Sequence, residues 1–267
     1  MARGKFLLRQ CSLPGVEAVE AATDHVFPKH THEQFGIGVI RRGAQKSLSG
    51  RGVVDAGPGD VITVNPGEVH DGMPIGDQGR AWAMLYFDPA VILDAVSHVT
   101  ERSAGTELRH PVLNDREAAA NLLRLYSIVT DNADRLMIQA ESLLLSLVNR
   151  LISERTARPL DRLPQSLHRA KSLIDDRPTD DLSLGDLADA SGLSRFQVLR
   201  GLTKMTGLTP HAYLMQKRTD LARRLIRRGL VLADVAAASG FADQSHMTRI
   251  FVSKYGVTPG AYAAAMR

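Results

Sequence analysis

The first ninety residues alternate between short apolar runs and turn-forming residues. The clearest apolar runs cover residues 36–40, 61–64 and 82–87. Between them lie segments such as Gly57-Pro-Gly-Asp60 and Asn65-Pro-Gly67, whose composition is typical of tight turns. Short strands separated by regular turns predict a small antiparallel β-barrel or sandwich.

After residue 115 the apolar residues recur at helical spacing. Two helices are predicted, over residues 115–129 and 138–152, because apolar side chains return there every three or four positions. One interpretation packs both helices on the barrel. The second helix is apolar around much of its circumference, so the alternative is that it forms the seam of a homodimer.

Residues 153–165 are polar and contain two prolines, so they are predicted to connect two domains. Beyond them alanine, leucine and arginine dominate, and the pattern is helical to the end of the chain. The predicted fold is multidomain α+β. A β-barrel with two packing helices spans residues 1–152, and an all-α domain spans residues 166–267.

The last hundred residues contain an internal repeat. The segment Asp186-Leu-Ala-Asp-Ala-Ser-Gly-Leu193 returns 48 positions later as Asp234-Val-Ala-Ala-Ala-Ser-Gly-Phe241. Further along the offset becomes 49, as Thr209-Pro210 and Thr258-Pro259 show, so the second copy has one extra residue just after the turn. The repeat predicts two copies of one supersecondary unit.

Each copy predicts a short helix, a tight turn and a longer helix. In the first copy Ser183 caps a helix, Gly192 supplies the permissive backbone that ends it, and Ser194 opens the next helix. Gln197 stands three residues after Ser194, as a capping box requires. This order is typical of the helix-turn-helix of DNA-binding proteins. An ordinary helical hairpin gives the same signals once, but two matched copies favour DNA binding.

A long helix is predicted between the two copies. Thr209 is an N-cap followed by proline at the first helical position, and the helix can run to about Arg228. Roughly 19 residues at 1.5 Å each span about 28 Å, close to the ~34 Å between successive major grooves on one face of DNA. One rigid helix can therefore hold two DNA-reading units near that spacing. Some of its basic residues are candidates for phosphate contacts, and the alternative is that most of them form a solvated face. They are Lys217, Arg218, Arg223, Arg224, Arg227 and Arg228.

Charge is distributed unevenly along the chain. Residues 165–267 hold 15 lysines and arginines against 9 aspartates and glutamates, a net charge of +6, whereas residues 1–164 carry −2. A basic C-terminal part suits a polyanionic partner. The single cysteine, Cys11, excludes an intrachain disulfide. No apolar stretch suits a signal peptide or a membrane span, so we expect a cytoplasmic protein without membrane contact.

These features resemble the AraC/XylS family of transcription regulators, whose DNA-binding domain is two helix-turn-helix subdomains joined by a long helix. The segments Gly240-Phe-Ala-Asp-Gln-Ser-His-Met-Thr-Arg-Ile-Phe251 and Tyr255-Gly-Val-Thr-Pro-Gly-Ala-Tyr262 are very similar to the signature of that family. Gly201 departs from the family pattern, which has a large apolar residue there. Glycine inside a helix lowers its stability by about 1 kcal/mol against alanine, so the first reading unit is expected to be the looser one.

The early residues of each second helix are predicted to face the floor of the major groove. Arginine can bind guanine through two hydrogen bonds, and glutamine can do the same with adenine. Phe196 either contacts a thymine methyl or packs inside the fold, whereas Lys204 and Lys254 are predicted to contact phosphates. The predicted DNA-binding set is Arg195, Phe196, Gln197, Arg200, Lys204, Gln244, Ser245, His246, Thr248, Arg249 and Lys254.

The first domain resembles the cupin-like sensor domain of the same family. The resemblance lies in His30-Thr-His32 and in the turn motif that ends at His70, and it implies a small barrel that holds an effector. Enzymatic cupins bind a metal through two histidines, a glutamate and a later histidine. Here the glutamate is absent. A hydrogen-bonding or structural role for the histidines is therefore preferred over a zinc or iron site, and no metal or other cofactor is assigned.

Trp82, Met84 and Tyr86 alternate and therefore share one face of a strand. By resemblance to the arabinose-responsive member of the family, Arg42, Trp82 and Met84 lie at pocket positions. An arginine among aromatic and apolar walls suits a small anion or a polyol. The alternative is a packed barrel core with Arg42 at its rim. The predicted effector-binding set is His30, His32, Arg42, His70, Trp82, Met84 and Tyr86.

The sequence thus predicts a sequence-specific DNA-binding transcription regulator, not an enzyme, controlled by a small molecule in the barrel. Its expected partners are a double-stranded promoter operator spanning two adjacent major grooves, the effector, a second copy of the chain and RNA polymerase. One competing hypothesis is a metal-dependent cupin enzyme with a DNA-binding tail. Another is a DNA-repair enzyme, which needs a reactive cysteine that the isolated Cys11 does not supply.

Overall fold

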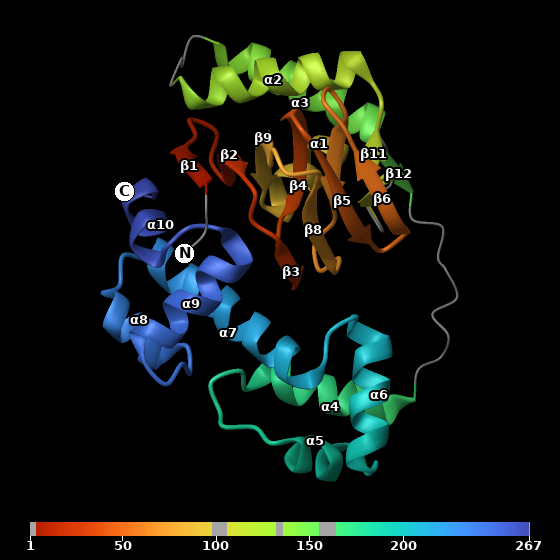
Figure 1. The fold of residues 1–267 in the computed structure, drawn as a ribbon, viewed down its shortest axis with the longest axis vertical. Helices are drawn as coiled ribbons and strands as arrows, with labels where there is room; N and C mark the ends of the chain where they lie inside the picture. The colour runs from red at the N-terminus through yellow and green to blue at the C-terminus, as the bar shows by residue number, and fades with distance from the viewer. Residues whose placement is uncertain (1–3, 98–105, 132–135, 155–163, 267) are drawn as a thin grey trace. The chain divides into compact units, whose positions relative to one another are not determined.

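The computed structural model describes residues 4–97, 106–131, 136–154 and 164–266. The chain divides into two compact units, one up to residue 157 and one from Arg158 to Ala264 (Figure 1). The first unit is rich in β-strands and the second is helical, which confirms the predicted α+β multidomain fold.

Two antiparallel sheets build most of the first unit. The strands of the larger sheet are β1 (Gly4–Gln10), β2 (Val16–Thr23), β4 (Phe35–Arg42), β7 (Val61–Val64), β9 (Arg80–Phe87) and β11 (Val112–Leu113). Those of the smaller sheet are β3 (Phe27–His30), β5 (Ala44–Ser49), β6 (Gly52–Ala56) and β8 (His70–Ile75). Their orders are β1-β2-β9-β4-β7-β11 and β3-β8-β5-β6. A separate pair joins β10 (Thr106–Leu108) to β12 (Ile152–Glu154).

Strand β9 has both of its faces buried. Leu85 and Phe87 lie in a core that the larger sheet shares with helices, whereas Trp82 and Met84 lie in a second core. The second core also takes Ala56 from the smaller sheet, so it lies between the two sheets. Successive strand residues point to opposite faces, and the predicted shared face of Trp82 and Met84 follows from that alternation.

Helices α1 (Pro89–Ser97), α2 (Arg116–Thr130) and α3 (Met137–Leu151) contribute most of the rest of the first core. The bounds of α2 and α3 confirm the two helices predicted from apolar spacing. Leu144, Leu147 and Val148 of α3 are buried in this core, so packing accounts for most of its apolar residues. Ile138, near the start of α3, is 81% exposed.

The end of the first unit differs from the sequence expectation. The sequence predicts that Ser153 and Glu154 lie in the connecting segment, but they belong to β12, which pairs in antiparallel register with β10. That assignment was wrong because a strand held by backbone hydrogen bonds to a distant segment has no local apolar signature. Residues 155–163 of the predicted connection lie outside the described residues.

Seven helices form the described part of the second unit. They are α4 (Gln165–Asp176), α5 (Leu184–Ser191), α6 (Arg195–Thr206), α7 (Pro210–Arg227), α8 (Leu232–Ala238), α9 (Gln244–Tyr255) and α10 (Pro259–Ala265). The pairs α5–α6 and α8–α9 are the two copies of the repeat. The long helix α7 contacts α6 of the first copy together with α4, and it contacts α8 and α9 of the second copy. It therefore connects the two copies, as the sequence predicts.

The local signals read from the sequence are confirmed. The Ser183 hydroxyl accepts from the amide of Asp186, and Gly192 ends α5 in the left-handed region at a φ of 69°. Ser194 and Gln197 form the capping box of α6. Thr209 caps α7, with proline at its first position. These short-range bonds satisfy amides that a helix start leaves without partners.

Gly201 marks a close approach of two helices, not a loose point. A Cβ at this position would lie 2.4 Å from the Leu167 Cδ2 atom of α4. Leu167 itself is buried. Because Gly201 has no side chain, α4 packs directly on the backbone of α6. The prediction that the first helix-turn-helix copy is the looser one is therefore wrong at this position.

Lys254 is buried, so its predicted contact with a phosphate is wrong. Its Nζ donates to Gln216 Oε1 on α7 at 2.6 Å, and the side chain is only 8% exposed. Gln216 in turn donates to Asp220, which also accepts from the Tyr255 hydroxyl. The offset of 49 aligns Lys254 with Met205, a half-buried apolar position, so the repeat itself contained the signal.

Two of the basic residues predicted to decorate α7 are also buried. Arg218 donates to the backbone carbonyls of Pro178 and Asp180, and Arg223 donates to the Tyr262 hydroxyl. Both arginines hold loops or helices onto α7, because a buried guanidinium needs acceptors inside the fold. They are therefore unavailable for phosphates.

Replacing Gly201 by alanine is expected to destabilise the second unit, although alanine is the better helix former. Helix propensity favours alanine by about 1 kcal/mol, but forcing a methyl into a packed contact costs about 1–3 kcal/mol. Urea unfolding followed by far-UV circular dichroism measures the resulting change in the free energy of unfolding. In a Leu167→Ala background the methyl has room, so the same change should become neutral or stabilising. An equal effect in both backgrounds would contradict the close contact.

The stability contributed by Lys254 is expected to depend on pH. Burial lowers its pKa to about 8 in the folded chain, against 10.5 for an ordinary lysine. Between these values the unfolded chain binds more protons, so raising the pH from 8 to 10 favours the folded state. The free energy of unfolding of the wild type, measured relative to Lys254→Met, should therefore rise over that range. A difference that stays constant or falls would count against a buried lysine.

Candidate DNA interface and effector site

Helix α6 exposes one face and buries the other. Val198 and Leu202 are buried in the core of the second unit. The predicted DNA-binding residues of this helix are all exposed, namely Arg195, Phe196, Gln197, Arg200 and Lys204. The core that fixes α6 thus leaves its basic, polar face available to a ligand.

Two of these residues have partners on the helix itself. Phe196 is 65% exposed, which excludes the alternative that it packs inside the fold. The guanidinium carbon of Arg200 lies 5.5 Å from the Phe196 ring centroid, a cation–π contact one turn apart. Gln197 Oε1 accepts from the Ser194 amide at 2.9 Å, so a paired contact of Gln197 with adenine requires that the cap opens.

Helix α9 repeats this arrangement with differences. Gln244, Ser245 and Arg249 are exposed, whereas His246 and Thr248 are half-buried. The His246 ring lies edge-on to Phe241, with 5.4 Å between the centroids. In the first copy Gly192 is followed two residues later by the cap of α6, whereas Gly240 is followed three residues later by Asp243, the cap of α9. The extra residue therefore lies in the turn, as the change of offset indicates.

The buried arginine between the two sheets is Arg80, not Arg42. Arg80 is 1% exposed, and its guanidinium carbon lies 5.0 Å from the Trp82 ring centroid. It donates to Gln45 Oε1 and to the His25 carbonyl. Burial lowers the pKa of Arg80 to about 10, which still leaves it charged at neutral pH. No carboxylate of the described residues forms an ion pair with it.

Arg42 is exposed at the end of β4. The pairing of β4 with β9 shifts between Ile40 and Arg42, which places Arg42 opposite Ala81. Arg42 therefore does not join the residues around Trp82, and the pocket position that the family resemblance implied for it is wrong, because the bulge changes its register. The two-residue spacing from Arg80 through Trp82 to Met84 was the signal that pointed to Arg80 instead.

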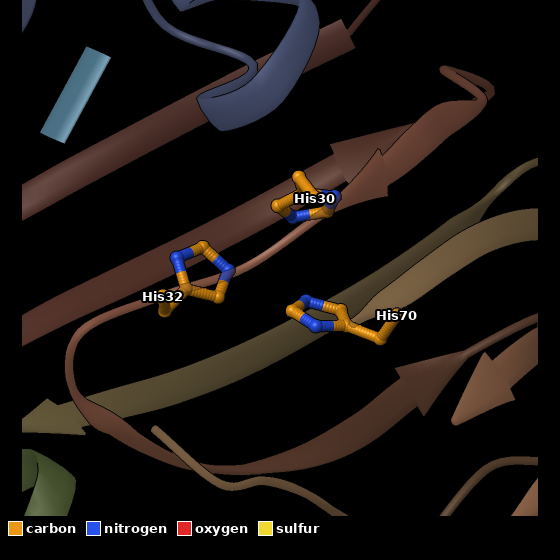
Figure 2. Close-up of side chains that lie close together, drawn as sticks. All are labelled: His30, His32 and His70. Atoms are coloured by element: carbon orange, nitrogen blue, oxygen red, sulfur yellow. The ribbon is translucent and has the colours of Figure 1, made fainter. Parts of the chain in front are cut away.

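Three of the predicted effector residues form a compact cluster (Figure 2). One ring nitrogen from each of His30, His32 and His70 lies within 4.8 Å of the other two. His30 and His32 are buried, His70 is half-buried, and the Tyr86 ring lies 4.9 Å from that of His32. Desolvation lowers the pKa of His70, which favours its neutral imidazole.

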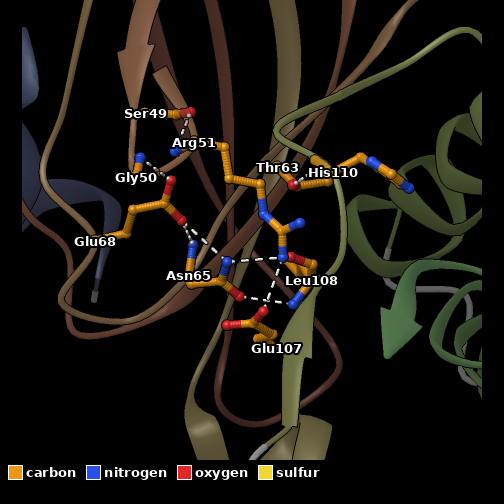
Figure 3. Close-up of polar contacts among 9 residues, drawn as sticks. All are labelled: Ser49, Gly50, Arg51, Thr63, Asn65, Glu68, Glu107, Leu108 and His110. Carbon is orange, nitrogen blue, oxygen red and sulfur yellow. Dashed lines mark hydrogen bonds and ion pairs between the residues drawn. The ribbon is translucent and has the colours of Figure 1, made fainter. Parts of the chain in front are cut away.

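The turn that leads into His70 is held by side-chain bonds (Figure 3). Glu68 accepts from the amides of Asn65 and Gly50, and Asn65 exchanges two hydrogen bonds with the backbone of Leu108. The Glu68 carbonyl then lies 3.0 Å from Nδ1 of His70. The Pro-Gly-Glu-Val-His motif therefore serves to position His70, and Glu68 is fully engaged in the turn.

Cys11 has the properties of an inert thiol. Burial, with a smaller contribution from the charge of Glu17, raises its pKa to about 12. A reactive cysteine needs a lowered pKa, so the hypothesis of a DNA-repair enzyme loses its nucleophile.

No described helix is both long and apolar enough to cross a lipid bilayer.

Comparison with known proteins agrees with both units. A family model for the AraC-like ligand binding domain matches residues 13–148, and one for a helix-turn-helix domain matches residues 187–265. The uncharacterized HTH-type transcriptional regulator YbfI of Bacillus subtilis is 28% identical over 225 residues, 83% of this chain and 81% of YbfI. The transcriptional activator NphR of Rhodococcus is 38% identical over 100 residues, 37% of this chain and 30% of NphR.

Solved structures show the same fold. ToxT of Vibrio cholerae aligns with a TM-score of 0.57 over 95% of this chain and 99% of ToxT, at 12% identity. A ToxT structure with a bound unsaturated fatty acid aligns with a TM-score of 0.53 over 98% and 97%, at 16% identity. The hypothesis of a cupin enzyme with a DNA-binding tail gains no support from these comparisons.

A helix-turn-helix domain implies DNA as a partner, and a ligand-binding domain implies a small-molecule effector. The repeated helices, the two-sheet first unit and the matches over both units lead to one conclusion: the chain belongs to the AraC family of transcriptional regulators.

Proposed function

We propose that this regulator reads a specific operator with α6 and α9, and that its activity responds to an anionic small molecule bound next to Arg80. The observation that carries the first part is the pair Arg200 and Arg249. They occupy matching positions of the repeat, and both are exposed on helices whose opposite faces are buried.

The two helices are suited to reading bases in different ways. On α6, Arg200 stands over Phe196, which restrains the guanidinium before DNA binds. On α9, Gln244, Ser245 and Arg249 form an exposed polar surface. Arginine selects guanine and glutamine selects adenine in the major groove, so each helix carries at least one base-reading side chain. Lys204 is assigned to a phosphate.

The effector proposal rests on the charge of Arg80. A buried cation without an ion-paired carboxylate is costly unless a ligand anion approaches it. Aromatic and apolar side chains adjoin it, including Trp82 and Phe27, whose ring lies 5.8 Å from the guanidinium carbon. A molecule with an apolar body and one carboxylate fits this chemistry. The fatty acid bound to ToxT, a protein of the same fold, is a ligand of that class.

We assign the sensor role to the first unit and DNA reading to the second, and we place the protein in the cytoplasm, where its DNA target lies. A homodimer completes the proposal, because paired half-sites double the contacts with DNA. The exposed Ile138 on α3 supports an interface there. RNA polymerase is proposed as a further partner, since NphR is an activator by name.

Arg200→Ala and Arg249→Ala are each expected to weaken operator binding by about 1–3 kcal/mol and to relax the base preference at one position. Lys204→Ala should instead weaken binding to all duplexes alike, and it should reduce the slope of log K against log salt concentration by about 1. The operator is first selected from random duplexes with the purified protein. Fluorescence anisotropy at fixed salt then compares it with its single-base variants.

Arg177→Ala is the matched control, because Arg177 is exposed at the end of α4 and its loss changes the net charge equally. It should leave base preference unchanged. The assignment of α6 fails if Arg200→Ala behaves like Arg177→Ala, with a uniform loss across all duplexes.

Arg80→Met is expected to abolish a preference for acids over neutral analogues. A hydrogen bond to a charged group contributes about 1.5–3 kcal/mol, so oleate should bind at least about 10-fold more tightly than its methyl ester. Trp82 is the single tryptophan of the chain, and its fluorescence reports binding. Arg42→Met is the control and should retain the preference. If Arg42→Met loses the preference for the acid and Arg80→Met keeps it, the carboxylate is bound by Arg42 and the proposal is contradicted.

A further inference from the structure

We propose that His30, His32 and His70 together bind one divalent transition-metal ion, of the class of Zn²⁺ or Co²⁺. This inference goes beyond the proposed function, since neither DNA reading nor an anionic effector requires an ion. It starts from the convergence of three imidazoles that come from two separate segments of the chain (Figure 2).

The distances between the three ring nitrogens are close to those that a bound metal ion requires. Zinc–nitrogen bonds of 2.0–2.1 Å at tetrahedral angles place two ligand nitrogens roughly 3.3 Å apart. The three nitrogens already lie within 4.8 Å of one another. Each nitrogen therefore has to move inward by only about 1 Å to reach that spacing.

In His30 and His70 one ring nitrogen faces a backbone carbonyl, as is common in metal-binding histidines. Nδ1 of His30 lies 2.7 Å from the Pro28 carbonyl, and Nδ1 of His70 lies 3.0 Å from the Glu68 carbonyl. A carbonyl can only accept, so Nδ1 carries the proton in each ring and Nε2 is the nitrogen with the lone pair that a metal bond requires. The His32 carbonyl accepts from the Gly67 amide at 2.8 Å, which ties the two segments together.

The donor set selects the class of ion. The cluster contains imidazoles and no carboxylate, a set that suits zinc, cobalt, nickel, copper or iron and does not suit magnesium or calcium. Three protein ligands leave one tetrahedral position open for water or an anion. An ion held by neutral ligands keeps its full charge, so this position would favour an anion.

The competing explanation is a hydrogen-bonded histidine cluster with a purely structural role, as the sequence analysis preferred. The two explanations differ in what an added ion does. A structural cluster gains no stability from metal. A three-histidine site is stabilised by metal, because the ion binds the folded chain and joins the β3–β4 connection to β8.

The test uses the full chain, first treated with a chelator and then titrated with Co²⁺. We expect one ion per chain, visible d–d absorption of a nitrogen-ligated cobalt ion, and a thermal midpoint that rises with Co²⁺ or Zn²⁺ but not with Mg²⁺. His32→Ala is expected to lower the affinity by about 100-fold or more. His110→Ala is the matched control, because His110 is exposed and does not belong to the cluster.

Wild-type protein without cobalt absorption and without a metal-dependent midpoint would overturn the proposal, whatever the variants do. So would binding that His32→Ala and His110→Ala reduce equally, since that result would place the ion elsewhere. Should His32→Ala fold poorly, His70→Gln keeps a polar side chain of similar reach and must show the same loss. The titration needs neither operator nor effector, so its result is independent of the proposed function.

Discussion

Burial of both faces of β9 is the constraint on which the first unit depends. One face packs against the helices through Leu85 and Phe87, and the other faces the smaller sheet through Trp82 and Met84. Because strand residues alternate, a polar side chain in the inward register must enter the space between the sheets. Arg80 does so, and its charge is the main reason to expect an anionic ligand there.

Buried cations recur in this protein and have different consequences in the two units. In the second unit Lys254, Arg218 and Arg223 each find acceptors on neighbouring helices or loops, so they fix the elements that surround α7. In the first unit Arg80 finds an amide and a carbonyl but no carboxylate. Arg218 is likewise held by two carbonyls, so the reason to expect a ligand at Arg80 is its place between the sheets, beside the rings of Trp82 and Phe27.

Helix α6 shows how packing and the proposed contacts with DNA share one short element. Gly201 faces Leu167 of α4 and allows close contact, while Arg200, next to it in the chain, stays exposed beside Phe196. The inward positions pack the helix against its neighbours, and the outward positions stay exposed.

The sequence by itself determined the features that depend on near neighbours. These are the repeat, the caps at Ser183 and Ser194, the long helix after Thr209 and the shared face of Trp82 and Met84. Only the tertiary structure decided which cations are buried, which arginine lies between the sheets, and that β12 pairs with a distant strand. Periodicity and capping act over a few residues, whereas bulges, helix approach and desolvation arise from segments that the chain brings together only on folding.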